Sequence, residues 1–179
     1  MNLVRIICIL CLSLANDCAA YVLTLSFPFS QCIQRASSVL NNNAKLYGAN
    51  NALDNKNAST SWYSEGEADG SSEHSFIVNF HRRVKISSIA LQFQGGFVAE
   101  KCQFYTTTIS TEGKVKWKEV EDAYIEPENV NDLQMFELEE CECADDLKCD
   151  AIKLNFGESS DFYGRVILYK IEVYGAEEQ

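Results

Sequence analysis

A polar turn near the end of the chain leads straight into a long apolar run, and this run restricts the fold more than any other part of the sequence. Ser160, Asp161 and Gly164 are turn-forming residues. From Ile167 to Val173 the side chains alternate at the period of a β-strand, and the first part of the run is apolar on both faces. A strand that begins buried on both faces and ends half exposed is typical of the last strand of a β-sandwich. We therefore expect this strand to close a sandwich beside its first strand.

Short alternating runs continue through the body of the chain, with almost no helical periodicity between them. We expect strands at residues 77–80, 84–94, 104–109, 114–120, 133–138 and 152–156, and one helical turn at residues 50–53. Gly113 supplies a hairpin turn between residues 104–109 and 114–120. Many short strands separated by turns predict an all-β fold, a sandwich or jelly roll. We expect a single domain at residues 32–175, followed by a tail at 176–179.

The N-terminal residues 1–20 have the shape of a secretory signal. Arg5 is followed by the apolar stretch Ile6–Ala15, which is too short to span a membrane. The alternative is an extension from an uncertain gene start, and residues 21–31 are expected to form a linker. If residues 1–20 are a signal peptide, the chain is secreted, and the sequon at Asn57 becomes a glycosylation site.

Acidic residues are concentrated in one region. Residues 112–150 hold 14 of the 26 acidic residues and only four lysines, in a chain of net charge −11. Such a field repels phosphate groups, so we expect no direct binding of nucleic acid and no electrostatic docking on a membrane. The sequence also carries no nucleophile elbow, no phosphate-binding glycine loop and no zinc-protease motif. We therefore expect a binding protein that is not an enzyme and uses no cofactor.

The cysteines are possible zinc ligands, but their spacing in the sequence is not that of the usual zinc sites. Cys141, Cys143 and Cys149, with Cys102 as a fourth ligand, would make a zinc site, but the paired knuckles of such sites are missing. We expect unligated thiols or one loop disulfide instead, and no metal.

Several blocks of sequence resemble known proteins. Ala52–Asp54 and Ser59–Trp62, followed by strands, resemble the entry of a discoidin, or coagulation factor type C, domain of the galactose-binding-like group. Arg35–Asn41, Leu91–Phe97 and Asp161–Val166 resemble the small nuclear-receptor-associated protein family. The resemblance implies a discoidin-like jelly-roll β-sandwich.

The same resemblance implies a function and a location. Members of the family bind an orphan nuclear receptor and repress its transcriptional activity, which implies a nuclear receptor as protein partner and a place in the nucleus or cytoplasm. Three features depart from the family, namely residues 1–20, Ser61, where the family tends to carry cysteine, and the acidic stretch around Cys141–Cys149, which is expanded here. The alternative is a secreted discoidin-like lectin or adhesion module that binds glycans or a cell surface. The sequence makes no prediction of the oligomeric state.

Loops at one end of such a sandwich are the usual place for a binding site. The candidate residues near them are Trp62, Tyr63, Tyr47, Asn55, His74 and Arg165. Trp62 either stacks on a ligand or fills the core beneath the loop, and the core interpretation is favoured. Arg165 either grips an acidic partner or pairs with Asp161. His74 and His81 lack a ligand pattern, and we expect both at the surface.

Two further segments have competing interpretations. Asp54, with Thr60 and nearby carbonyl groups, has the oxygen ligands of a weak calcium site, but the favoured interpretation is that Asp54 caps a turn. Asp161–Val166 is interpreted as the turn that closes the sandwich, so the binding residues are expected in other loops.

Overall fold

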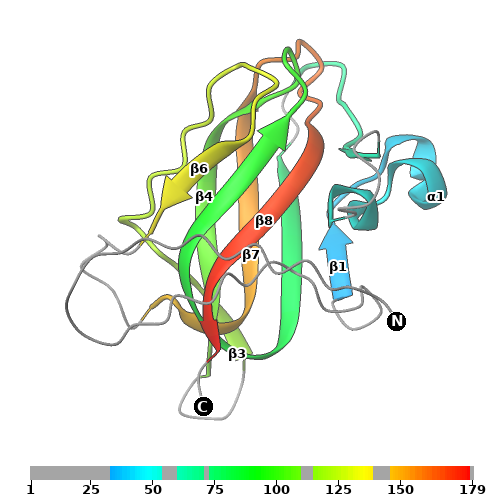
Figure 1. Cartoon of the computed structure of the whole chain (residues 1–179). Helices are drawn as coiled ribbons and strands as arrows, with labels where there is room; N and C mark the ends of the chain where they lie inside the picture. The colour runs from blue at the N-terminus through cyan, green and yellow to red at the C-terminus, as the bar shows by residue number, and fades with distance from the viewer. Residues whose placement is uncertain (1–32, 54–59, 71–72, 110–114, 139–145, 178–179) are drawn as a thin grey trace, which may run out of the picture.

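Strands dominate the part of the chain that the structure describes. The computed structural model describes residues 33–53, 60–70, 73–109, 115–138 and 146–177 (Figure 1). Its strands are β1 (Ile33–Ala36), β2 (Trp62–Tyr63), β3 (His74–Phe93), β4 (Ala99–Ile109), β5 (Val115–Glu119), β6 (Gln134–Glu137), β7 (Lys148–Ser159) and β8 (Ile167–Glu177). Its helices are η2 (Leu40–Asn42), α1 (Ala44–Tyr47) and η3 (Ala49–Leu53). The predicted all-β fold and the helical turn at 50–53 are confirmed, and no helix within the described ranges is long and apolar enough to span a membrane.

The longest strand, β3, belongs to both halves of the sheet. Its first half, from His74 to Asn79, pairs with β1 and β7, and its second half, from Val84 to Phe93, pairs mainly with β8 and β6. The register shifts between Asn79 and Val84, where His81 has a left-handed backbone with φ of 54°. This bulge turns the strand. The sheet, in the order β2-β8-β3-β7-β4-β5, therefore folds over until its two halves face each other (Figure 1).

β3 replaces two strands that the sequence predicts at residues 77–80 and 84–94. The prediction divides them at the polar residues between, where the apolar alternation stops. In the structure the Asn79 side chain accepts a hydrogen bond from the backbone N–H of His81, with an N···O distance of 2.8 Å. Because this bond satisfies the bulge locally, the strand bends there instead of ending.

The last strand, β8, has the burial that the sequence predicts. Ile167 and Leu168 are both buried at its start, and buried and half-buried residues alternate from Ile171 onward. β8 continues to Glu177, beyond the expected end of the domain at residue 175. The expectation that it packs beside the first strand is wrong: β8 lies between β3 and β2, because β1 pairs with the first half of β3.

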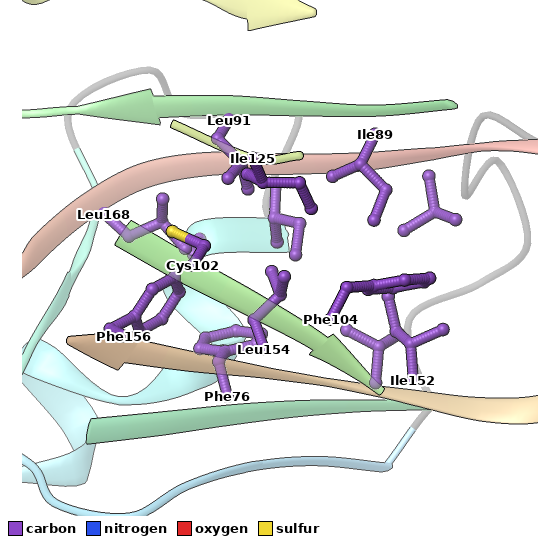
Figure 2. Packing of buried hydrophobic residues seen from close by; sticks show 14 of the residues in the cluster. Phe76, Ile89, Leu91, Cys102, Phe104, Ile125, Ile152, Leu154, Phe156 and Leu168 are labelled. Atoms are coloured by element: carbon purple, nitrogen blue, oxygen red, sulfur yellow. The ribbon is translucent and has the colours of Figure 1, made fainter. Parts of the chain in front are cut away.

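The core lies between the two halves of the folded sheet. Figure 2 shows side chains from both halves pointing toward one another across it. Side chains that are at most 1% exposed include Phe76, Leu154 and Phe156 from one half and Ile89, Leu91 and Leu168 from the other. Full burial of such a side chain stabilises the fold by roughly 1.5–3 kcal/mol.

The predicted hairpin of residues 104–109 and 114–120 is confirmed by the pairing of β4 with β5. Thr107 lies opposite Trp117 in this antiparallel ladder. The turn around Gly113 lies outside the described residues.

Gly175 is expected to tolerate no larger residue, because a Cβ atom there would clash with the backbone oxygen of Lys85 on β3. Gly175→Ala should lower the free energy of unfolding by about 1–3 kcal/mol, the usual cost of overpacking. Gly157→Ala is the matched control, because its nearest neighbour would lie 4.0 Å away. Urea unfolding of both variants measures the difference, and equal stability of the two would contradict the close approach of β8 to β3.

Candidate functional site

Three loops meet at the end of the sandwich where β3 ends and β8 begins, at the top of Figure 1. We call this surface the loop end, and it comprises residues 64–70, 94–98 and 159–166. The Ser64 backbone N–H donates to the Val166 carbonyl at 2.9 Å, and the Ser64 hydroxyl accepts from the Val166 N–H at 2.8 Å. The Ser160 N–H donates to the Val98 carbonyl at 2.9 Å, and the Ser160 hydroxyl accepts from the Val98 N–H at 2.9 Å. These reciprocal bonds join the loops into one continuous surface.

An ion pair holds the turn that precedes β8. Arg165 donates from Nε to Asp161 Oδ2 at 2.8 Å and from Nη2 to Asp161 Oδ1 at 3.0 Å. The Asp161 carboxylate also accepts from the backbone N–H groups of Tyr163 and Arg165. The hydrogen bond from Arg165 lowers the pKa of Asp161, and the same bond raises the pKa of Arg165. The interpretation that Arg165 pairs with Asp161 is therefore what the structure supports, and the pairing balances the charge of the guanidinium.

Aromatic side chains surround this ion pair and extend into solvent. The guanidinium carbon of Arg165 lies 5.0 Å from the centre of the Phe97 ring and 5.4 Å from that of Tyr163. The Phe162 and Tyr163 rings meet edge to face at 5.2 Å. Phe162 is nevertheless 80% exposed and Tyr163 is 49% exposed. The turn thus presents a large apolar side chain to solvent on a backbone that hydrogen bonds hold in place.

His74 lies beneath this turn, so the expectation that it is a surface residue is wrong. It is 5% exposed, and its Nε2 atom lies 3.1 Å from the carbonyl oxygen of Gly164. Its Nδ1 atom lies 3.1 Å from the hydroxyl oxygen of Ser38. Burial lowers the pKa of His74 below its ordinary value, which favours the neutral ring. The expectation for His81 is confirmed, because that residue is exposed.

Trp62 is a core residue, as the favoured interpretation predicts. Its side chain is wholly buried, and its ring packs against Phe76 at 5.4 Å and Phe156 at 5.7 Å between ring centres. The indole N–H donates to the Ser38 carbonyl at 3.0 Å. No ring face is left for a ligand, so the stacking role that was the alternative for Trp62 has no support in this structure.

Two other candidates, Tyr47 and Tyr63, lie beside each other. Their ring centres are 4.8 Å apart, and both side chains are half buried. Tyr63 lies on β2 opposite Ile167 at the start of β8, so the pair borders the loop end. Leu46, next to Tyr47, is 58% exposed and adds apolar surface there.

The calcium and glycosylation candidates fall mainly outside the described residues. Asp54, Asn55 and Asn57 belong to residues 54–59, which the structure does not describe. Thr60 is described, and its hydroxyl donates to the backbone oxygen of Asn51 at 3.2 Å. Among the described residues no group of three or more acidic, histidine or cysteine side chains has the geometry of a metal site.

The two described cysteines lie far apart and do not share a metal. Cys102 pairs with Phe156 on β7, and Cys149 lies seven residues earlier on that strand. At 3.3 Å per residue this separation is about 23 Å, so the interpretation of Cys102 as a ligand beside Cys149 is wrong. Burial raises the pKa of Cys149 to about 12 and the pKa of Cys102 well above its usual range. Both are unreactive core thiols.

Phe162 and Tyr163 are the residues that the sequence interpretation missed. Asp161–Val166 is predicted as a closing turn only, whereas the structure shows that it also carries the most exposed aromatic side chain in the described residues. The sequence signal that could have identified them is the presence of two bulky aromatic residues inside a turn, where polar residues and glycine are usual.

Comparison with known proteins gives one family. A model described as the F5/8 type C domain matches residues 34–143. The nuclear receptor 2C2-associated protein of Danio rerio is 32% identical and aligns over 80% of this chain and 91% of that protein. The protein of the same name from Xenopus tropicalis is 35% identical over 82% and 95%, and that from Homo sapiens is 29% identical over 86% and 98%.

Solved structures share the fold. The F5/8 type C domain of a Bacteroides fragilis protein has a TM-score of 0.64 at 17% identity, covering 85% of this chain and 96% of that chain. The family 32 CBM from C. perfringens NanJ, solved in complex with galactose, has a TM-score of 0.58 at 21% identity, covering 82% and 96%. These likenesses confirm the predicted discoidin-like jelly roll.

The burial of His74 is expected to make stability depend on pH. Because its pKa is lowered in the folded chain, the unfolded chain takes up a proton more readily below about pH 6.5. The free energy of unfolding should therefore fall as the pH decreases from about 6.5 to about 5.5. Urea midpoints at about pH 7.5 and about pH 5.5 measure this fall, which should shrink in His74→Gln and persist in His81→Asn. An equal fall in the wild type and in His74→Gln would exclude His74 as the source.

Proposed function

Because the chain belongs to the family of nuclear receptor 2C2-associated proteins, built on an F5/8 type C domain, we propose that it binds a nuclear receptor through the loop end. In this proposal the chain acts by binding, without catalysis, and lowers the transcription that the receptor drives. The partner is a protein, as the names of the relatives imply, and the place of action is the nucleus or cytoplasm.

The exposed turn at Phe162 and Tyr163 is the observation that carries this proposal. Aromatic side chains supply a large part of the binding energy at protein interfaces. Less conformational entropy is lost on binding when the contacting loop is already ordered. The Asp161–Arg165 pair and the bonds between Ser64 and Val166 provide that order before any partner arrives. Phe162 therefore has both the exposure and the rigid support of an interface anchor.

The net charge of the loop end indicates which kind of protein surface it can bind. Glu65, Glu67 and Asp69 lie on the loop of residues 64–70, and Arg165 is already paired with Asp161. The loop end therefore carries more negative than positive charge. A protein surface that is basic and has an apolar pocket complements the loop end. The acidic side chains of the loop end repel the phosphate groups of nucleic acid.

A second candidate function is that of a secreted module that binds glycans. The apolar residues 1–20 and the sequon at Asn57 favour it. The location and the N-terminal residue of the native protein separate the two functions. A chain that begins near residue 21, outside the cell and glycosylated at Asn57, supports the second; an unglycosylated nuclear protein supports the first.

Phe162→Ala is expected to weaken binding to purified nuclear receptor 2C2 about tenfold or more, the usual effect of removing an interface anchor. Tyr163→Ala should weaken binding less, because its ring is more buried. Tyr124→Ala is the matched control, since Tyr124 is 77% exposed but lies outside the loop end. Titration calorimetry of the three variants, after circular dichroism has verified their folding, gives the affinities. Unchanged binding by Phe162→Ala would overturn the placement of the interface at the loop end.

A further inference from the structure

Strand β5 forms one edge of the sheet and belongs to none of the loops of the loop end. In the sheet order it follows β4 and has no further neighbour, and all five of its residues, Val115–Glu119, are exposed. We propose that the outer edge of β5 binds an extended protein segment in which apolar and acidic residues alternate, and that this segment pairs with β5 as an additional antiparallel strand. This inference goes beyond the proposed function, because it concerns a second surface and a second partner.

The backbone groups of alternate residues in β5 point away from the sheet. Val120, directly after β5, donates its N–H to the Phe104 carbonyl at 2.9 Å, so these two residues form a hydrogen-bonded pair. In an antiparallel ladder such pairs recur at every second residue, and the register of β4 with β5 has no shift. Lys116 and Lys118 therefore direct their N–H and C=O groups to β4. The three odd-numbered residues of β5 direct theirs outward, where no other strand of the described ranges pairs with them.

One face of β5 offers apolar surface beside this edge. Trp117 is 39% exposed, and Val115, two residues earlier on the same face, is 68% exposed. The Nζ atom of Lys153 on β7 lies 5.5 Å from the centre of the Trp117 ring and 4.2 Å from the centre of the Tyr105 ring. This cation–π contact orients the Trp117 ring and leaves part of it accessible. An apolar side chain opposite Trp117 on an added strand therefore covers exposed apolar surface.

The other face of β5 carries lysine side chains. Lys116 and Lys118 are two of the four lysines in the acidic residues 112–150, and Lys118 Nζ is bound to Asp146 at 2.6 Å. With an added strand, both lysines would form the non-hydrogen-bonded pairs, in which opposed side chains lie closest together. An acidic residue of the added strand opposite Lys116 or Lys118 is therefore favourable.

A second copy of the chain is a poor partner for this edge. Two β5 strands that pair around Trp117 would place Lys116 of each copy opposite Lys118 of the other, and like charges in opposed positions are destabilising. Pairing around Glu119 would place that carboxylate opposite its own copy. The charges of β5 therefore oppose self-association of the edge, and they favour an acidic segment of another protein.

A synthetic peptide tests the pairing directly. In antiparallel register, acetyl-Thr-Glu-Ile-Glu-Ile-amide places its two glutamates opposite Lys118 and Lys116 and its central isoleucine opposite Trp117. Hydrogen exchange of the ¹⁵N-labelled chain with saturating peptide should show protection of the Trp117 amide rising about tenfold or more. The amides of Lys116 and Lys118 should change little, because they point to β4. A peptide that does not bind, or that leaves the Trp117 amide unprotected, would overturn the proposal.

Two N-methylated forms of this peptide show whether the binding is strand pairing. Methylation of the central isoleucine nitrogen removes the N–H that donates to the Trp117 carbonyl, so it should weaken binding about tenfold or more. Methylation of the second glutamate nitrogen changes an N–H that points away from β5, so it should leave the affinity within about twofold. Equal affinities of the two methylated peptides would contradict the pairing with β5.

Reversal of one charge tests the recognition of acidic residues. Lys116→Glu should weaken binding of the peptide about fivefold and should strengthen binding of the same peptide with lysine as its fourth residue. Lys45→Glu is the matched control, because Lys45 is exposed and lies on α1, and it should change neither affinity. The fluorescence of Trp117, the more exposed of the two tryptophans, follows both titrations.

Two further outcomes would overturn the proposal. Equal loss of affinity in Lys116→Glu and Lys45→Glu would reduce the recognition to the net charge of the chain. A dimer in analytical ultracentrifugation, with the Trp117 amide protected before any peptide is added, would assign the edge of β5 to a second copy.

Discussion

The bend in β3 is the constraint on which the rest of the structure depends. Because the strand turns at its bulge between Asn79 and Val84 without ending, one continuous strand serves both halves of the sheet. The two ends of β3 are thereby brought to the same end of the sandwich (Figure 1). The core of Figure 2 fills the space that this bend encloses. The loop end forms because this bend places the two ends of β3, with the loops attached to them, at one end of the sandwich.

The loop end, which is the proposed binding surface, is held in place by residues of the core. Trp62 and His74 anchor it from below, one by packing in the core and the other by hydrogen bonds to the backbone of the turn. The Asp161–Arg165 pair then orders the turn from above, where it is partly exposed to solvent. This partly exposed ion pair restricts the conformations of the turn. In the proposed function, its contribution is therefore the fixed position of Phe162.

The sequence predicts the strands well because alternation reports burial directly. β8 follows from that pattern, and the β4–β5 hairpin follows from the turn residue Gly113, because β5 is exposed on both faces. The bend in β3 follows from neither signal, because the left-handed residue at the bulge is His81 and not glycine. The burial of His74 is also predictable from the sequence pattern. It has the same parity as Phe76 and Val78, which places it on the buried face of the strand.

The candidate site is less predictable because it depends on contacts between distant segments. Trp62 is correctly placed in the core on the basis of its size and apolar surface. The turn that carries Phe162 is hydrogen-bonded to the loops at residues 64–70 and 94–98, which no local pattern connects with it. The match to the F5/8 type C domain covers residues 34–143, so it ends before this turn and leaves the choice of binding residues to the geometry.

The central claim is that the loop end is the surface that meets the receptor. Backbone amide spectra of the ¹⁵N-labelled chain, recorded with and without unlabelled nuclear receptor 2C2, test it most directly. The account predicts that the perturbed amides cluster in residues 64–70, 94–98 and 159–166. Perturbations concentrated on β5 or on residues 121–137, with the loop end unchanged, would contradict it.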